Sequence, residues 1–342
     1  MQTPLPQRAL TQWIALSDHM GAITPAGLAD VVQTGSLVVE FTCPADGGSV
    51  LLDHRADAGW PRGFSIFHDA QAGLVILHRQ GAAVARHILP GPLPQDWALA
   101  RLTFAWDGPA RHWSLRLEDV QGAWSREARG TNPLPLAGPD LLALCAGGQG
   151  SRRDASVQWF GVALTTPSPQ SATWIGHRTP VETLRGRVAA GDLRIGDQLL
   201  TLDHGPRPLR AMHHGQMPNR GRFAPVLLRA PYFARQTDLL VAQGQLTLLS
   251  GVAVEYLFGE DAVLAPAFAL RDGNSALSDA RRPITTGISL DLGAPLVILA
   301  DGCPLLINLD STKAALPYRL LHDYETTTLQ SLLGRGGQRS AA

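Results

Sequence analysis

The chain has 342 residues, of which 45% are hydrophobic and 17% charged, and its formal net charge is zero. This length predicts two domains, and the balanced charge excludes the basic field that nucleic acid or an anionic membrane would need. The N-terminus has no long apolar run after a basic start, and no stretch reaches about 18 consecutive apolar residues. We therefore expect no Sec signal peptide and no membrane span. Localisation stays open between the cytoplasm, a non-Sec export route and export as part of a particle.

The first half of the chain predicts a series of short strands. In 112–119, Trp113, Leu115 and Leu117 alternate with polar residues, which places the apolar set on one face of a sheet. Gly, Pro, Asp or Asn bound many of the segments, as turns require. Strands at this spacing, without helical periodicity between them, predict a β-sandwich. The expected strands are 36–43, 49–54, 63–69, 73–80, 98–108, 112–119, 140–147 and 156–164.

A Pro/Ser/Thr-rich stretch, "TTPSPQSAT" (165–173), predicts a linker. Seven of the eight tryptophans precede it and all four tyrosines follow it, which favours two separately built cores. We therefore predict domains at 1–164 and 174–336, joined by 165–173 and followed by a disordered tail, 337–342. The second half is also strand-rich, with one helix expected at 324–334. Its expected strands are 181–186, 198–203, 224–230, 238–251, 261–270 and 295–302.

The three cysteines, Cys43, Cys145 and Cys303, are far apart and none has metal-ligand spacing. A Cys43–Cys145 disulfide is one reading, but isolated positions favour buried free thiols.

The strand order of the first half, and "LTFAWDG" followed by "WSLRLED" in particular, resembles the laminin-G/concanavalin-like jelly roll over about residues 30–165. In that family a strand that ends in Asp-Gly turns into the next strand. Relatives of this kind often hold calcium and stack sugars on aromatic side chains in their rim loops. The resemblance therefore implies a binding module with a protein or glycan partner.

The second half resembles the Hint (hedgehog/intein) domain, in the form found in bacterial proteins. Three segments carry the resemblance in order: "AAGDLRIGDQLLTLDHGPRPLR" (189–210), "APVLLRA" with "DLLVAQGQLTLLSG" (224–251), and "LFGEDAVLAPAFAL" (257–270). The resemblance implies a compact, pseudo-symmetric all-β fold. It also implies self-processing, in which an N–S or N–O acyl shift converts a backbone amide into a reactive ester.

The acyl shift needs a side-chain nucleophile at the first residue of the domain. In the family this is a cysteine four residues ahead of the position held here by Arg178, and counting back gives Trp174. An indole cannot attack a carbonyl. Thr173 or Ser171 could serve as an unusual nucleophile, although both lie in a linker where hydroxyl residues are expected anyway.

The shift also needs a proton donor and oxyanion donors. The family's histidine follows a Pro-Gln pair, and the matching run here is Gln243, Gly244 and Gln245, so Gln245 replaces it. A glutamine forms hydrogen bonds but does not relay a proton near pH 7. Ser289 and Pro295 stand where two further histidines would be placed. Loss of these groups with intact scaffold motifs predicts a domain that no longer cleaves itself.

A second candidate site lies in "LLDHRADAGW", where Asp53, His54 and Asp57 precede Trp60. Two aspartates begin the oxygen-rich ligand set that calcium prefers, and an exposed tryptophan can stack on a sugar. The alternative is a polar loop beside a core tryptophan. His213 and His214 are adjacent, so on a strand they would face opposite sides, and we expect them on an exposed loop. Turn geometry alone explains His204.

We therefore expect an all-β protein: an N-terminal jelly-roll sandwich, then a Hint-like domain with a short C-terminal helix. The predicted function is non-catalytic binding or assembly, with no cofactor other than the candidate calcium and with a protein or glycan partner. A homo-oligomer or larger assembly is a further candidate. The two alternatives are a self-cleaving Hint protein and a lectin-like sugar-binding module.

Overall fold

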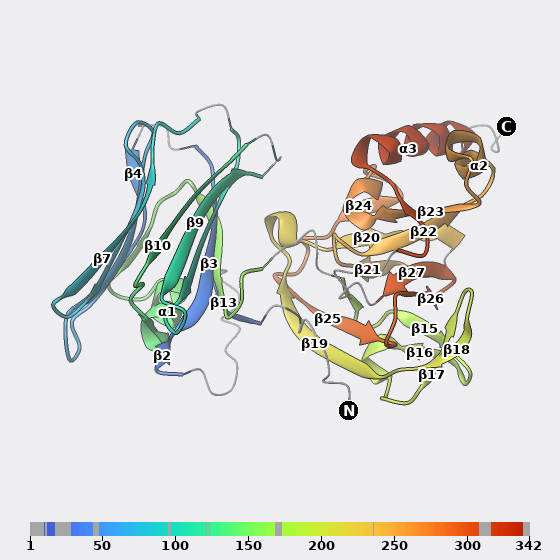
Figure 1. Ribbon diagram of the computed structural model, residues 1–342, viewed down its shortest axis with the longest axis horizontal. Helices are drawn as coiled ribbons and strands as arrows, with labels where there is room; N and C mark the ends of the chain where they lie inside the picture. The colour runs from blue at the N-terminus through green and yellow to red at the C-terminus, as the bar shows by residue number, and fades with distance from the viewer. Residues whose placement is uncertain are drawn as a thin grey trace. The chain divides into compact units, whose positions relative to one another are not determined.

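The computed structural model describes residues 10, 12–17, 29–43, 48–94, 97–120, 122, 124–167, 173–234, 236–307 and 316–337. These residues fall into two compact units (Figure 1). The sandwich unit comprises the described residues within 12–167. The C-terminal unit comprises Leu10 and the described residues from 173 onward.

The sandwich unit is built from two antiparallel sheets. The first has the order β1-β13-β3-β8-β9-β10, the second has the order β12-β4-β5-β6-β7, and β2 pairs with β11. The strands are β1 Trp13–Leu16, β2 Val31–Val32, β3 Thr34–Phe41, β4 Gly48–Ala56, β5 Arg62–Asp69, β6 Gly73–Gln80, β7 Ala83–Pro90, β8 Ala100–Asp107, β9 His112–Asp119, β10 Ser125–Thr131, β11 Leu136–Ala137, β12 Ser151–Arg153 and β13 Val157–Ala163. The β-sandwich predicted for the first half of the chain is thereby confirmed.

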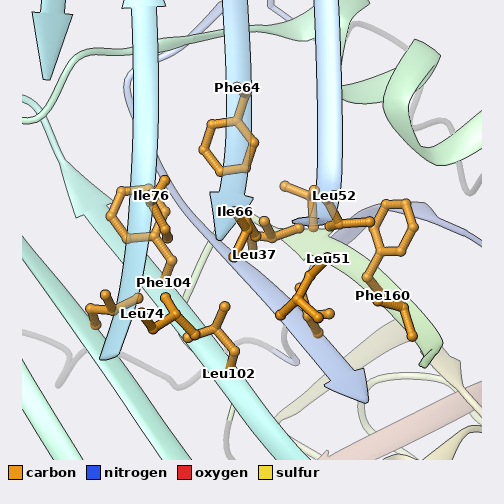
Figure 2. Close-up of a cluster of buried hydrophobic side chains, with 14 of the residues drawn as sticks. Leu37, Leu51, Leu52, Phe64, Ile66, Leu74, Ile76, Leu102, Phe104 and Phe160 are labelled. Atoms are coloured by element: carbon orange, nitrogen blue, oxygen red, sulfur yellow. The ribbon is translucent and has the colours of Figure 1, made fainter. Parts of the chain in front are cut away.

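Alternating residues from the two sheets meet in one core (Figure 2). Leu37 and Phe104 come from the first sheet, and Ile66, Leu74 and Ile76 come from the second; all five are almost completely buried. Burying a side chain of this size contributes about 1.5–3 kcal/mol. The predicted inward set of β9, with Trp113 at its start, is also confirmed as buried. The cysteines are free, and Cys145 is buried, which raises the pKa of its thiol to about 12.

The predicted strand at 140–147 is wrong, because the segment forms helix α1, Gly138–Ala146. Pro139 lies in its first turn, where a proline costs no hydrogen bond. Gly147 ends it in a left-handed conformation with φ of 68°. The buried residues Leu141, Leu144 and Cys145 have helical spacing. The apolar run therefore encodes a short helix that packs on the sandwich core.

A charged group lies buried on the first sheet. Glu40 is completely buried and accepts two hydrogen bonds from the Arg101 guanidinium, at 3.0 and 2.7 Å. The Trp159 indole donates a third hydrogen bond to the same carboxylate, at 2.7 Å. Buried charges are tolerated only when they are paired in this way.

The C-terminal unit contains two further sheets, which share a core. One has the order β19-β25-β14-β21-β20-β24; the other has the order β16-β15-β17-β26-β27-β22-β23-β28, with β18 paired to β17. Their strands are β14 Ile175–Gly176, β15 Pro180–Thr183, β16 Gly186–Ala189, β17 Gln198–Thr201, β18 Gly205–Pro208, β19 Ala211–Pro218, β20 Val226–Leu228, β21 Leu239–Val241, β22 Leu246–Ser250, β23 Ala262–Pro266, β24 Ala276–Ser278, β25 Ile284–Asp291, β26 Leu296–Ala300, β27 Cys303–Ile307 and β28 Arg319–Leu320.

The described part of the C-terminal unit also contains two α-helices: α2, Val252–Phe258, and α3, Asp323–Gly337. Helix α3 confirms the expected C-terminal helix. Within the described part of the chain, no helix combines the length and apolarity that crossing a membrane needs. The predicted strand at 238–251 is two strands, β21 and β22, separated by a turn at 242–245. The turn forms because the Gln245 N–H donates to the Ala242 carbonyl, at 3.1 Å. It places Gln245 directly before β22.

Candidate functional site

Trp174 directly precedes the central strand β14, which pairs with β21 on one side and β25 on the other. Its indole is 4% exposed, and its carbonyl accepts a hydrogen bond from the Ala242 N–H, at 2.9 Å. The ring lies against Gly287 of β25, where an added Cβ would stand only 2.8 Å from Trp174 Cδ2. The glycine therefore provides the space that the indole fills.

Gln245 is 1% exposed, and its carboxamide is held by backbone acceptors. Nε2 donates to the Leu306 carbonyl at 2.6 Å and to the Leu246 carbonyl at 3.3 Å. The neighbouring Gln243 is also buried and donates to the Ala224 carbonyl, at 2.8 Å. Both amides therefore satisfy backbone carbonyls, a structural task that needs no proton transfer.

The structure brings Thr173, Trp174, Gln245 and Ser289 together around one small pocket of about 10 Å³. That volume holds roughly one water molecule. Apolar side chains complete the lining: Ile175, Ile288, Leu290 and Ile307. Two of the lining residues are alcohols, and none titrates near pH 7. Pro295 is not part of the lining, and Ser171 lies outside the described residues.

The predicted rim residues of the sandwich unit do not form one cluster. Asp53 and His54 are neighbours on β4, so their side chains face opposite sides of the sheet. Asp53 accepts a hydrogen bond from Ser65 Oγ, at 2.5 Å, and lies 3.3 Å from Arg55 Nε. Asp57 is exposed. Among the described residues, no three His, Cys, Asp or Glu side chains gather where they could share a metal ion.

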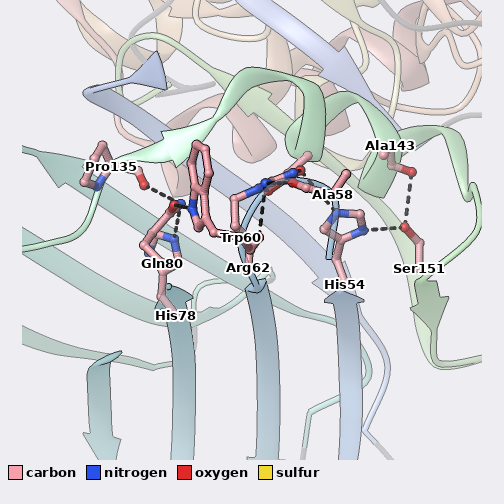
Figure 3. A network of polar contacts seen from close by, with 10 residues as sticks. His54, Ala58, Trp60, Arg62, His78, Gln80, Pro135, Ala143 and Ser151 are labelled. Carbon is pink, nitrogen blue, oxygen red and sulfur yellow. Dashed lines mark hydrogen bonds and ion pairs between the residues drawn. The ribbon is translucent and has the colours of Figure 1, made fainter. Parts of the chain in front are cut away.

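His54 instead belongs to a polar network beneath α1 (Figure 3). Its Nδ1 lies 2.8 Å from Ser151 Oγ, and that hydroxyl donates to the Ala143 carbonyl at 3.2 Å. Its Nε2 lies 3.8 Å from Asp140 Oδ1. Asp140 accepts two hydrogen bonds from Arg62, at 2.7 and 3.0 Å. Helix α1 is thereby tied to strands β4 and β5.

Trp60 is the exposed member of this network, with 54% of its surface accessible. The Arg62 guanidinium lies 5.0 Å from the ring centroid, and Trp60 Nε1 donates to Gln80 Oε1 at 3.4 Å. The structure therefore joins Trp60 and His54 through Arg62 and Asp140. Sequence reasoning missed Arg62 and Asp140, because they lie 78 positions apart in the chain and carry no local pattern.

The expectation for His213 and His214 is wrong in one respect. Both lie on strand β19, paired with Ser289 and Ile288 of β25, and not on a loop. His214 is exposed and His213 is half-buried. His204 lies in the turn between β17 and β18, as predicted.

Comparison with known proteins adds a family to this geometry. Residues 175–305 match the family model described as the Hint domain. No curated protein matches the sequence. Solved structures that are similar include the following three. The MchDnaB-1 intein is 19% identical, covering 39% of this chain and 99% of that one, with a TM-score of 0.27.

The other two resemble wider stretches of the chain. The Ruminococcus gnavus IT-sialidase CBM40, solved with α2,6-sialyllactose, is 9% identical over 46% of this chain and 92% of that one, with a TM-score of 0.29. Mouse laminin α1 domains LG4-5 are 10% identical over 92% of this chain and 89% of that one, with a TM-score of 0.24. The family match and the two sheets with a shared core agree on one identification. Residues 175–305 of this chain form a Hint domain.

Proposed function

We propose that this protein acts by binding or assembly, and that its Hint domain no longer performs an acyl shift. The observation that carries the proposal is the pairing of a buried Trp174 with a backbone-bound Gln245 around a pocket of about 10 Å³. In this proposal the sequence divides at the predicted boundaries, with 165–173 as the connection.

The side chains at the pocket explain the loss of chemistry. Attack on a carbonyl needs an accessible lone pair on a thiol, hydroxyl or amine, and the indole of Trp174 has none. Departure of the amide nitrogen needs a proton from a group that titrates near neutral pH, and the carboxamide of Gln245 does not supply one. Both side chains have the contacts expected of core residues.

Trp60 is our candidate for the binding surface of the sandwich unit. Because the Arg62 guanidinium already lies beside the ring, the indole is held in place before a ligand arrives, which lowers the entropy cost of binding. A sugar ring or an apolar protein side chain could stack on its accessible surface.

We expect the wild-type chain to bind a subset of sugars on a glycan array, and the Trp60→Ala variant to lose at least about tenfold in affinity, equivalent to about 1.4 kcal/mol. Tyr256→Ala is the matched control, because Tyr256 is 79% exposed on the C-terminal unit. Failure of the wild type to bind any glycan would leave a protein partner as the ligand class. Equal binding by wild type and Trp60→Ala would remove Trp60 from the site.

A second candidate function is self-cleavage with Thr173 as nucleophile. One observation favours it: Thr173 lines the same pocket as Gln245 and Ser289. This candidate predicts a break at the peptide bond that precedes Thr173, and N-terminal sequencing of any fragment would locate that bond. Abolition of the break by Thr173→Ala would establish it.

A further inference from the structure

Four histidines lie buried on the inner face of the second sheet of the sandwich unit. Strands β4, β5, β6 and β7 contribute one each: His54, His68, His78 and His87, with exposures of 3%, 2%, 1% and 1%. In the C-terminal unit, by contrast, His213 is half-buried and the other histidines are exposed: His177, His204, His214 and His322. The two units therefore differ in how they hold a titratable ring.

His68 and His87 are surrounded by aromatic rings. His68 lies 5.7 Å from Phe41 and 6.1 Å from Trp97, and both of its ring nitrogens are buried without a hydrogen-bond partner. His87 lies 4.7 Å from both Phe104 and Trp113, which come from the opposite sheet, and its nitrogens are likewise without a partner. Among the described residues, no group accepts a hydrogen bond from either ring.

His78 lies on β6, between the strands that carry His68 and His87. Its ring is 5.8 Å from Phe64, Nε2 is 3.3 Å from Gln80 Nε2, and Nδ1 has no partner. Burial lowers the pKa of His78 to about 4, with His87 acting in the same direction and Asp140 opposing it. Burial also lowers the pKa of His87 to about 4.

In the part of the chain that the structure describes, two carboxylates act on these rings, Asp69 and Asp140. Asp69 follows His68 in sequence and only partly offsets the burial that lowers the pKa of His68. On the α1 side, Asp140 is already bound by Arg62 and lies 3.8 Å from His54. His54 therefore has a carboxylate close by, whereas Asp69 and Asp140 only partly offset the effect of burial at His68 and His78. At His87, burial alone lowers the pKa.

We propose that the sandwich unit is an acid-sensitive module, in which protonation of His68, His78 and His87 opens the fold at mildly acidic pH while the C-terminal unit stays folded. The proposal is independent of whether the Hint domain cleaves itself or what the sandwich unit binds. One chain would thus give two different responses to the same fall in pH.

The direction follows from proton binding. In the unfolded chain a histidine takes up a proton near pH 6.5. In the folded sandwich His78 and His87 stay neutral until about pH 4, so stability is complete above pH 6.5 and is lost as the pH falls towards 4. Each of these two rings adds about one proton to unfolding near pH 5–6, and His68 adds up to one more. The unfolding constant should therefore rise about 100- to 1000-fold per pH unit.

Urea unfolding of the full chain between pH 7.5 and 5 tests this, followed by tryptophan fluorescence because seven of the eight tryptophans lie before residue 165. We expect the sandwich transition to move to lower urea below pH 6.5, and the transition of the C-terminal unit, seen by far-UV circular dichroism, to stay in place.

Variants identify the responsible rings. His87→Leu and His68→Leu should each reduce the pH dependence, by about tenfold per pH unit for His87→Leu, whereas His112→Gln, at an exposed histidine of the same unit, should leave it unchanged. A wild-type transition that does not move between pH 7.5 and 5 would overturn the proposal, even if a leucine variant failed to fold. Unchanged pH dependence in both folded leucine variants would also overturn it.

Discussion

Replacing Trp174 by alanine is expected to lower the free energy of unfolding of the C-terminal unit by about 3–5 kcal/mol. The reason is that the indole is 4% exposed and fills the space over Gly287, so its removal loses apolar burial and leaves a cavity. Hydrogen exchange of the strand peptides that contain β21, β22 and β25 measures the change. Tyr256→Ala, at a position 79% exposed, is the control and should shift stability by less than about 0.5 kcal/mol.

The contact between Trp174 and Gly287 predicts how substitutions at the two positions should combine. In the wild type, Gly287→Ala should destabilise, because the new Cβ would lie 2.8 Å from the indole. In the Trp174→Ala background the same methyl group occupies vacated space, so the two changes together should cost less than their sum. A loss below about 1 kcal/mol for Trp174→Ala would show that the indole is not a core residue, and the account of the pocket would fail.

Replacing Arg101 by alanine is expected to cost the sandwich unit about 3–5 kcal/mol, because the completely buried Glu40 carboxylate would lose its counter-charge. Urea unfolding followed by tryptophan fluorescence reports this unit. The exposed pair Arg129 and Glu127 is the matched control, since Arg129 is 77% exposed, and Arg129→Ala should leave the unfolding transition close to that of the wild type.

A double variant separates charge from packing at Glu40. Arg101→Met with Glu40→Gln removes both charges but keeps an acceptor for the Trp159 indole. We expect it to recover most of the stability that Arg101→Ala loses. Equal destabilisation by the single and the double variant would mean that the arginine acts through its packing and not through its charge.

The alternation of apolar and polar residues predicted much of the sandwich fold. The predicted strands at 73–80 and 112–119 coincide with β6 and β9. Segment 140–147 failed because a short apolar run fits a strand or a buried helix equally well, and the decisive features, Pro139 and Gly147, lie at its ends. Strand β10 has only exposed or half-buried residues, so no apolar pattern marks it.

The residues of the candidate sites could likewise be predicted only in part. Trp174 and Gln245 could be placed from the sequence because short segments of the Hint resemblance fix their positions, and the structure brings them to one pocket. The network around Trp60 could not be placed. Arg62 and Asp140 lie on β5 and α1, and only the packing of the helix on the sheet makes them neighbours.

Intact-mass spectrometry of the purified full-length chain, with and without dithiothreitol, tests most directly whether the reactive centre has become part of the core. A cysteine- or hydroxyl-based acyl shift would leave an ester or thioester at the residue 172–174 joint, and a thiol would release the two fragments. We predict a single mass, that of the 342-residue chain, in both conditions. A pair of fragments that meet at this joint and increase with the thiol would contradict it.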